Sequence, residues 1–291
     1  MLLVPFAPGG IADLTARAVA RAMAGVLGQP VVVDNRPSAG SIVASQAVAR
    51  AAPDGHTLLL MSNAHAVSAG LFRTLPYDAV RDFAPIALLA SFDLAFFVAA
   101  ESRFDSLKTW LAQARAQPGK LTIGSITPGS TQHLTAELLK ARAGIDAVVV
   151  PYKGTPAVLT ALRAGEIDLA VEILAPWLPQ LQARAVRALA VASAQRCSAA
   201  PEVPTLKELG VADAEASSWN ALAAPAGTPA AVVQRLNRAA DVALRDPAVR
   251  AQLLPLGVRL HGGPPEQLQH WLAQEIRHWA AVMRSAKIEP Q

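Results

Sequence analysis

Short apolar runs alternate along the chain with longer segments in which apolar residues recur every third or fourth position. The short runs have the composition of buried strands, and the longer segments have the period of helices. Strands that alternate with helices predict an α/β fold whose sheets are mainly parallel and flanked by helices. The expected strands are 2–6, 31–33, 57–61, 86–90, 94–100, 121–125, 147–150, 169–173 and 188–192, and the chain is expected to cross back at 218–222. The expected helices are 12–27, 42–51, 107–116, 131–142, 230–245 and 265–285.

The apolar stretch 83–100 approaches the length of a membrane span. Pro85 and the polar break at Ser91 and Asp93 divide it into two strand-length runs, 86–90 and 94–100. We therefore expect two buried strands rather than a transmembrane helix.

The length of the chain favours two lobes. With 291 residues, 52% of them hydrophobic, the chain can build two domains with separate cores. We expect residues 1–100 and 221–291 to form one discontinuous lobe and residues 101–220 the other, with a ligand cleft between them. The chain would then cross between the lobes twice.

Charge and cysteine content exclude several classes of protein. Lys and Arg total 26 against 22 Asp and Glu, without the basic cluster that nucleic-acid binding requires. The small positive excess suits an anionic ligand better. The single cysteine, Cys197, forms neither an internal disulfide nor a Cys-type zinc site. The first residues show no basic segment followed by an apolar stretch, and 1–4 reads as part of a strand, so we expect either a cytoplasmic protein or one whose leader has been removed.

A strand, a Pro-Gly turn and a helix start occur twice, at Pro8-Gly9-Gly10 and at Pro128-Gly129-Ser130. Glycine allows the positive φ that turns successive amides toward one point, and the helix end adds a partial positive charge. Each turn could bind a carboxylate without a cationic side chain. The alternative is that both are ordinary connections between a strand and a helix.

Other polar side chains follow strands at positions where they could orient a ligand. Ser62, Asn63 and His65 follow one strand, and Ser130, Thr131 and His133 open a helix. Helix capping or packing would explain each of them equally simply, above all Ser130. Glu172 lies at the end of a strand, where it could recognise an ammonium group or reject an anion. The alternative is an exposed or salt-bridged surface acid. Trp219, where the chain is expected to cross between the lobes, should pack between them rather than contact a ligand.

Known catalytic patterns are missing. The sequence contains no G-x-S-x-G, S-x-x-K, Walker, G-x-G-x-x-G or H-E-x-x-H motif. His270, Glu275 and His278 are spaced around a helix rather than along one face, so we expect no metal site there. We expect neither an enzyme nor a cofactor-binding protein.

Segments along nearly the whole chain resemble the receptors of tripartite tricarboxylate transporters, the Bug or TctC-like solute-binding proteins. The first three are 4–10 with Asp13 and Arg17, 31–37, and 52–58. The others, in the expected order, are 76–78 with 82–85, 118–121, 133–134, 150–154, 187–191, 201–205 and 218–219.

The resemblance implies a two-lobed, type II-like Venus-flytrap fold in the periplasm that delivers solute to membrane permease subunits. It implies a small mono- or dicarboxylate or an amino acid as ligand, a removed signal peptide, and no nucleic-acid partner; we expect a monomer. The implied ligand contacts in the first lobe are Phe6, Pro8, Gly9, Gly10, Ile11, Ala12, Asp13, Ser62, Asn63, Ala64 and His65. Those in the second lobe are Thr127, Pro128, Gly129, Ser130, Thr131, His133 and Glu172.

The chain departs from that family pattern at three places. Ile11 and Ala12 replace small hydroxyl residues, Glu172 replaces an Asp, and His56 replaces a Tyr. Ile11, Ala12 and Glu172 make a multiply charged ligand such as a tricarboxylate less suitable. Two other functions stay open: a receptor that signals to a membrane sensor kinase, and an enzyme on a similar bilobal fold.

Overall fold

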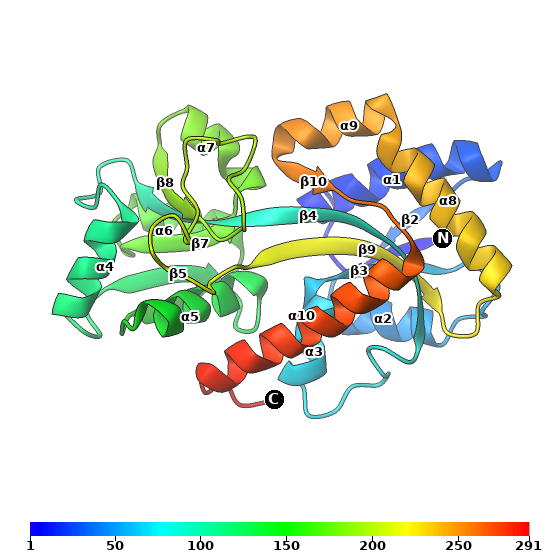
Figure 1. Cartoon of the computed structure of the whole chain (residues 1–291), viewed down its shortest axis with the longest axis horizontal. Coiled ribbons are helices and arrows are strands. Elements are labelled where there is room, and N and C mark those ends of the chain that lie inside the picture. Colours follow the sequence, from blue (N-terminus) through cyan, green and yellow to red (C-terminus); the bar gives the residue numbers. More distant parts are fainter. Residues whose placement is uncertain (291) are drawn as a thin grey trace. The chain divides into compact units, whose positions relative to one another are not determined.

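The apolar runs of the sequence are strands, and the amphipathic segments between them are helices (Figure 1). The computed structural model describes residues 1–290, and its contacts divide them into two α/β units. Unit 1 consists mainly of Met1–Ser91 and Trp219–Ala281, and unit 2 of Phe92–Ser218 with Val282–Ile288. The units thus differ from the expected lobes in the assignment of 92–100, 219–220 and 282–288.

The two expected strands 86–90 and 94–100 are one strand, β4 (Phe83–Ala99), which runs from unit 1 into unit 2. Ser91 and Asp93 do not interrupt it, because both are buried and bonded. Ser91 Oγ lies 2.8 Å from His261 Nε2, and the Asp93 carbonyl accepts the N–H of Leu174 at 2.8 Å. A polar residue in mid-strand is tolerated when its hydrogen bonds are made.

The sheet of unit 1 has the strand order β2-β1-β3-β9, followed by β4 and β10. Strand β1 is parallel to both of its neighbours, and β9 is antiparallel to β3. The strands besides β4 are β1 (Leu2–Val4), β2 (Val33–Asn35), β3 (Leu58–Ser62), β9 (Ser217–Pro225) and β10 (Val258–Leu260). Strand β2 begins two residues later than expected, because it is Val33–Asn35 that pairs with Leu2–Val4.

The helices of unit 1 lie in two groups, one on each side of its sheet (Figure 1). Helix α1 packs with α8 and α9, whereas α2, α3 and α10 contribute to a core around the fully buried Trp219. Trp219 is therefore a packing residue of the unit 1 core rather than the interlobe residue that its place in the sequence predicts. The helices are α1 (Ile11–Leu27), α2 (Ile42–Ala49), α3 (Asn63–Leu71), α8 (Ala230–Arg245), α9 (Pro247–Leu253) and α10 (Pro265–Ser285).

The sheet of unit 2 has the order β8-β4-β7-β5-β6. Strand β5 is parallel to β6 and β7, and β4 is antiparallel to β7 and β8. Helices α5 and α6 connect the parallel strands, and Cys197 is buried in a core cluster to which α6 also contributes. The elements are α4 (Leu107–Ala116), β5 (Thr122–Ile126), α5 (Thr131–Ala143), β6 (Val148–Tyr152), α6 (Thr155–Arg163), β7 (Leu169–Ile173), α7 (Leu178–Gln182) and β8 (Val186–Val191).

The sequence did not predict α3, α6, α7, α9 or β10. All of these elements are short, and α3 follows β3 directly, without a turn residue between them. None of the helices within residues 1–290 combines the length and apolarity needed to cross a membrane.

Candidate functional site

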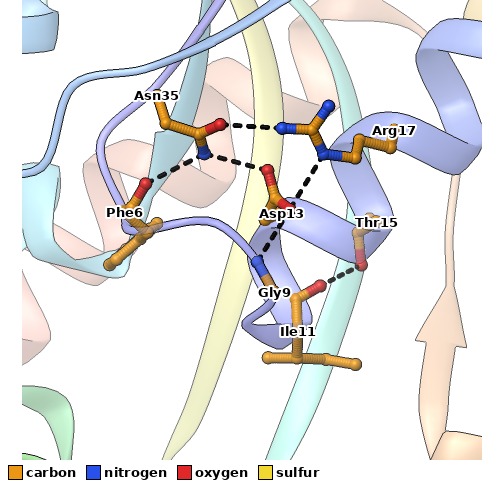
Figure 2. A network of polar contacts seen from close by, with 7 residues as sticks. All are labelled: Phe6, Gly9, Ile11, Asp13, Thr15, Arg17 and Asn35. Carbon is orange, nitrogen blue, oxygen red and sulfur yellow. Dashed lines mark hydrogen bonds and ion pairs between the residues drawn. The ribbon is translucent and has the colours of Figure 1, made fainter.

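The first Pro-Gly turn joins β1 to α1 and is held by the carboxylate of Asp13 (Figure 2). Asp13 Oδ2 accepts the N–H of Gly9 and the Nε–H of Arg17, each at 2.9 Å. Its Oδ1 accepts Asn35 Nδ2 at 2.8 Å, and the same amide nitrogen donates to the carbonyl of Phe6 at 3.0 Å. The network therefore holds the turn at Phe6 and at Gly9.

Asp13 is 2% exposed, although the i, i+4 spacing with Arg17 is typical of a solvated helix face. Burial alone would raise the pKa of this carboxyl, but hydrogen bonds from Arg17, Gly9 and Asn35 hold it below its ordinary value. Both oxygens of the ionised group contact the protein. Asp13 thus shapes the turn rather than presenting a free carboxylate, and the Gly9 amide that we expected to be free points at it.

Helix α1 begins without a side-chain cap. Its N-cap residue, Gly10, has extended backbone (φ −77°, ψ 168°) and no side-chain oxygen to accept a first-turn N–H. Pro8, Gly9 and Gly10 are exposed, and Ile11 is half-buried. The amides at the start of this 17-residue helix are therefore available to an anion, which the helix dipole also favours.

The second Pro-Gly turn, between β5 and α5, repeats this arrangement with different side chains. Gly9 and Gly129 both have positive φ, +88° and +77°. The N–H of Gly129 points at His133 Nδ1 at 3.4 Å, just as the N–H of Gly9 points at Asp13, four residues further along. In each turn a side chain of the following helix orients the glycine amide.

The start of α5 is capped, in contrast to that of α1. Ser130 Oγ accepts the N–H of His133 at 3.1 Å, so the capping role considered for Ser130 is the one it has. Burial lowers the pKa of His133, Glu137 opposes this shift and Lys140 adds to it. The neutral ring can accept at Nδ1. Thr127 and Pro128 are exposed at the tip of the turn, whereas Thr131 is buried.

Glu172 is the next-to-last residue of β7 in the same unit. It is buried rather than on the surface, with 1% of the residue exposed. Its Oε2 accepts Gln132 Nε2 at 3.1 Å and the N–H of Ile173 at 3.3 Å. Burial raises the pKa of Glu172, and the hydrogen bonds from Gln132, Thr155 and Ile173 oppose that shift. Glu172 is thereby tied to the second residue of α5.

Residues 62–65 form the end of β3 and the first turn of α3, not an open turn. Ser62, Asn63 and His65 are buried, and Ala64 is half-buried. Asn63 Oδ1 accepts Trp279 Nε1 at 2.8 Å, which ties α3 to α10. Both ends of the Asn63–His65 segment are thus engaged by protein groups.

His65 has both ring nitrogens within bonding distance of the protein. Nδ1 lies 3.0 Å from Ser45 Oγ, and Nε2 lies 2.9 Å from the carbonyl of Ala79. The ring packs against Tyr77 and Phe83. Burial lowers its pKa to about 4, against a smaller opposing effect of the Ala79 carbonyl. His65 is therefore a neutral packing residue at physiological pH.

Three residues of these turns were not among the predicted site residues: Arg17, Asn35 and Gln132. Arg17 could have been found from its i, i+4 spacing with Asp13. Asn35 could have been found from the parallel pairing of β1 and β2, which sets it opposite Val4. No group of three or more His, Cys, Asp or Glu side chains that could hold a metal occurs in the described part of the chain.

Comparison with known proteins gives a consistent result. A family model described as "Tripartite tricarboxylate transporter family receptor" matches residues 15–288. The chain is 39% identical over 282 residues to a UPF0065 protein from the tcbD-tcbE intergenic region of Pseudomonas sp. strain P51, covering 97% of this chain and 84% of that one. It is 35% identical over 285 residues to Protein BugT of Bordetella pertussis, covering 97% and 87%.

Solved structures are similar over almost the full chain. Rpa4515 of R. palustris, solved with adipate, has a TM-score of 0.89 and 33% identity, covering 100% of this chain and 98% of that one. The periplasmic binding protein BugD has a TM-score of 0.86 and 30% identity, with the same coverage. MatC of Rhodopseudomonas palustris, with bound malate, has a TM-score of 0.82 and 32% identity, covering 97% and 98%.

Proposed function

Since this chain belongs to the receptor family of tripartite tricarboxylate transporters, we propose that it is a periplasmic receptor that binds one small organic carboxylate and delivers it to membrane permease subunits. It has the two-lobed fold of the periplasmic binding proteins. The relatives solved with adipate and malate support a carboxylate as ligand. Binding as a monomer, without turnover, is part of the proposal.

The uncapped start of α1 is the observation that carries this proposal. A helix start whose N-cap is glycine and whose turn is exposed can donate several amides to one carboxylate. Arg17 is not needed, because its guanidinium already bonds Asp13 and Asn35. The site would therefore select anions by backbone geometry.

We propose that the helix start of each unit takes part in binding. In unit 1 the proposed contacts are Phe6, Pro8, Gly9, Gly10, Ile11 and Ala12, together with Ala64 in the first turn of α3. In unit 2 they would come from Thr127, Pro128, Gly129, Ser130 and Thr131, with His133 and Glu172. Asp13, Asn63 and His65 would not contact the ligand; they would position the site through their hydrogen bonds to other protein groups.

A thermal-shift panel tests the proposed function. Malate, adipate, short monocarboxylates and amino acids would be compared with glucose and ATP at equal ionic strength. A true ligand at a hundred times its Kd stabilises the fold by about 2.7 kcal/mol. We expect a concentration-dependent rise in Tm for at least one carboxylate and none for glucose or ATP.

Equal responses to all compounds, or no response to any carboxylate, would contradict the proposal. Nuclear magnetic resonance of the bound acid after prolonged incubation separates the receptor from an enzyme. An unchanged ligand spectrum is expected, whereas accumulation of a product would establish catalysis.

A further inference from the structure

Glu172 carries a carboxylate oxygen that the protein leaves without a hydrogen bond. Its Oε2 bonds Gln132 and the backbone of Ile173, and Thr155 lies close enough to favour the charged form. Oε1 is shielded from solvent and has no partner. An unpaired buried polar atom is costly, more so when it belongs to an ionisable group, and such atoms are rare in native proteins.

The position of Glu172 relates it to the second Pro-Gly turn. Strands β5 and β7 are parallel neighbours, with Gly124 paired to Ala170. Two residues further along, this register sets Glu172 level with Ile126, the last residue before the turn. In parallel α/β sheets ligands bind beyond the carboxyl ends of the strands, and Glu172 stands at that end of β7.

Gln132 connects Glu172 directly to the start of α5. It is the second residue of α5, and its side chain holds Oε2 of Glu172. The carboxyl group is thereby fixed beside the helix start that would bind a ligand carboxylate, with its other oxygen left to accept. Burial strengthens any hydrogen bond made there.

We propose that Glu172 selects, at the carboxylate site of the proposed function, acids that carry a hydrogen-bond donor beside the carboxylate. The donor is a hydroxyl or an ammonium group, and Oε1 accepts a hydrogen bond from it. A plain diacid would bind at the helix start and leave Oε1 unpaired. A site that leaves a buried acceptor unpaired discriminates against the ligand responsible. This inference rests on the proposed function and adds the ligand class.

Matched sets of acids test the inference by calorimetry on the purified full chain. Each set contains a plain diacid with its 2-hydroxy and 2-amino derivatives: succinate, malate and aspartate, and the corresponding sets built on glutarate and adipate. In the set that binds best, we expect the hydroxy or amino acid to bind at least about tenfold more tightly than the plain diacid.

Two variants identify the residue responsible. Glu172→Gln keeps the shape and removes the charge, and Glu172→Met removes both hydrogen-bonding oxygens. Glu172→Met should bring the ratio of affinities within a set to about threefold or less. Glu172→Gln should reduce the preference for an amino group more than that for a hydroxyl. Glu166→Gln, an exposed acid of the same unit, is the matched control and should leave every ratio unchanged.

Each ratio compares two ligands on the same variant, so a smaller fraction of folded protein affects both affinities equally and leaves the ratio unchanged. If Glu172→Met does not fold, Glu172→Gln alone tests the inference. Wild-type ratios near one would overturn the inference, and so would ratios that neither substitution changes. If short monocarboxylates bind but no diacid set does, the inference fails and the proposed function stands. If no carboxylate of any kind binds, both fail.

Discussion

Asp13 and His133 hold the same place in their two turns, four residues after a glycine whose N–H points at their side chains. One is a carboxylate with three donors, and the other is a neutral imidazole. The same backbone geometry is therefore maintained by different chemistry. What the two side chains share is an acceptor at the correct distance from the glycine amide.

Replacing Asp13 with Asn should destabilise the fold. The amide offers one acceptor where the carboxylate serves Gly9, Arg17 and Asn35, and its NH₂ group would face donors. We expect a loss of about 2 kcal/mol in the free energy of unfolding, measured by urea denaturation at pH 7. Asp54→Asn, at an exposed turn, is the control. Equal losses in the two variants would show that the network adds nothing.

His65 should make stability depend on pH. Its pKa is about 4 in the folded protein and about 6.5 when unfolded, so the unfolded state binds more protons between these values. The contribution is complete above about pH 6.5 and is lost as the pH falls toward 4. Between pH 7.5 and pH 5 we expect a loss of about 2 kcal/mol.

Urea denaturation of wild type and His65→Gln at both pH values measures the His65 contribution as a difference. The variant should lose about 2 kcal/mol less than wild type over this interval. His56→Gln, which changes an exposed histidine, should behave as wild type. If His65→Gln shows the full wild-type dependence, the protonation occurs elsewhere.

Helices α1 and α5 differ at the residue that opens them. Gly10 gives α1 no side-chain acceptor, and Ser130 caps α5. A capped start is more stable but has one fewer amide for a ligand. If the helix starts bind the ligand as we propose, we expect the stronger contacts at α1.

Gly10→Ser should raise stability and weaken binding together. Gly10 has negative φ, and a Cβ there meets nothing within 4 Å, so serine fits. Its hydroxyl would accept a hydrogen bond from a first-turn amide, which stabilises the helix by about a few tenths of a kcal/mol. The same hydroxyl would compete with the ligand carboxylate for that amide. Gly10→Ala adds the Cβ without the hydroxyl and is the matched control. Calorimetry should show weaker ligand binding for Ser than for Ala; equal affinities would refute the amide site.

Whole helices were well predicted where the amphipathic pattern is long. Helices α4, α8 and α10 begin and end where the sequence placed them. Helix α3 was missed because its first residues follow β3 directly and were taken as a turn. Its role as a buried support depends on Trp279, which lies 216 positions away in the sequence.

At the scale of the whole molecule, the net charge is only +4 and none of the proposed ligand contacts is Lys or Arg. Affinity should therefore depend little on salt, because the amides at a helix start carry only partial charges, whereas salt screens the full charges of exposed cationic side chains. Between about 20 and 200 mM sodium chloride we expect Kd to change less than about threefold by calorimetry. A change of tenfold or more would indicate that an exposed cationic side chain binds the ligand.

Local information determined the α/β alternation, the long helices and the two Pro-Gly turns, because period and turn chemistry depend on neighbouring residues. The family resemblance read from those segments was confirmed by the match over residues 15–288. Only the tertiary structure decided that Asp13 turns inward to Asn35, that β4 continues through Ser91, and that Glu172 is buried with one oxygen unpaired. Each of these depends on a partner far away in the sequence, and no local pattern records which distant residue will satisfy a polar group.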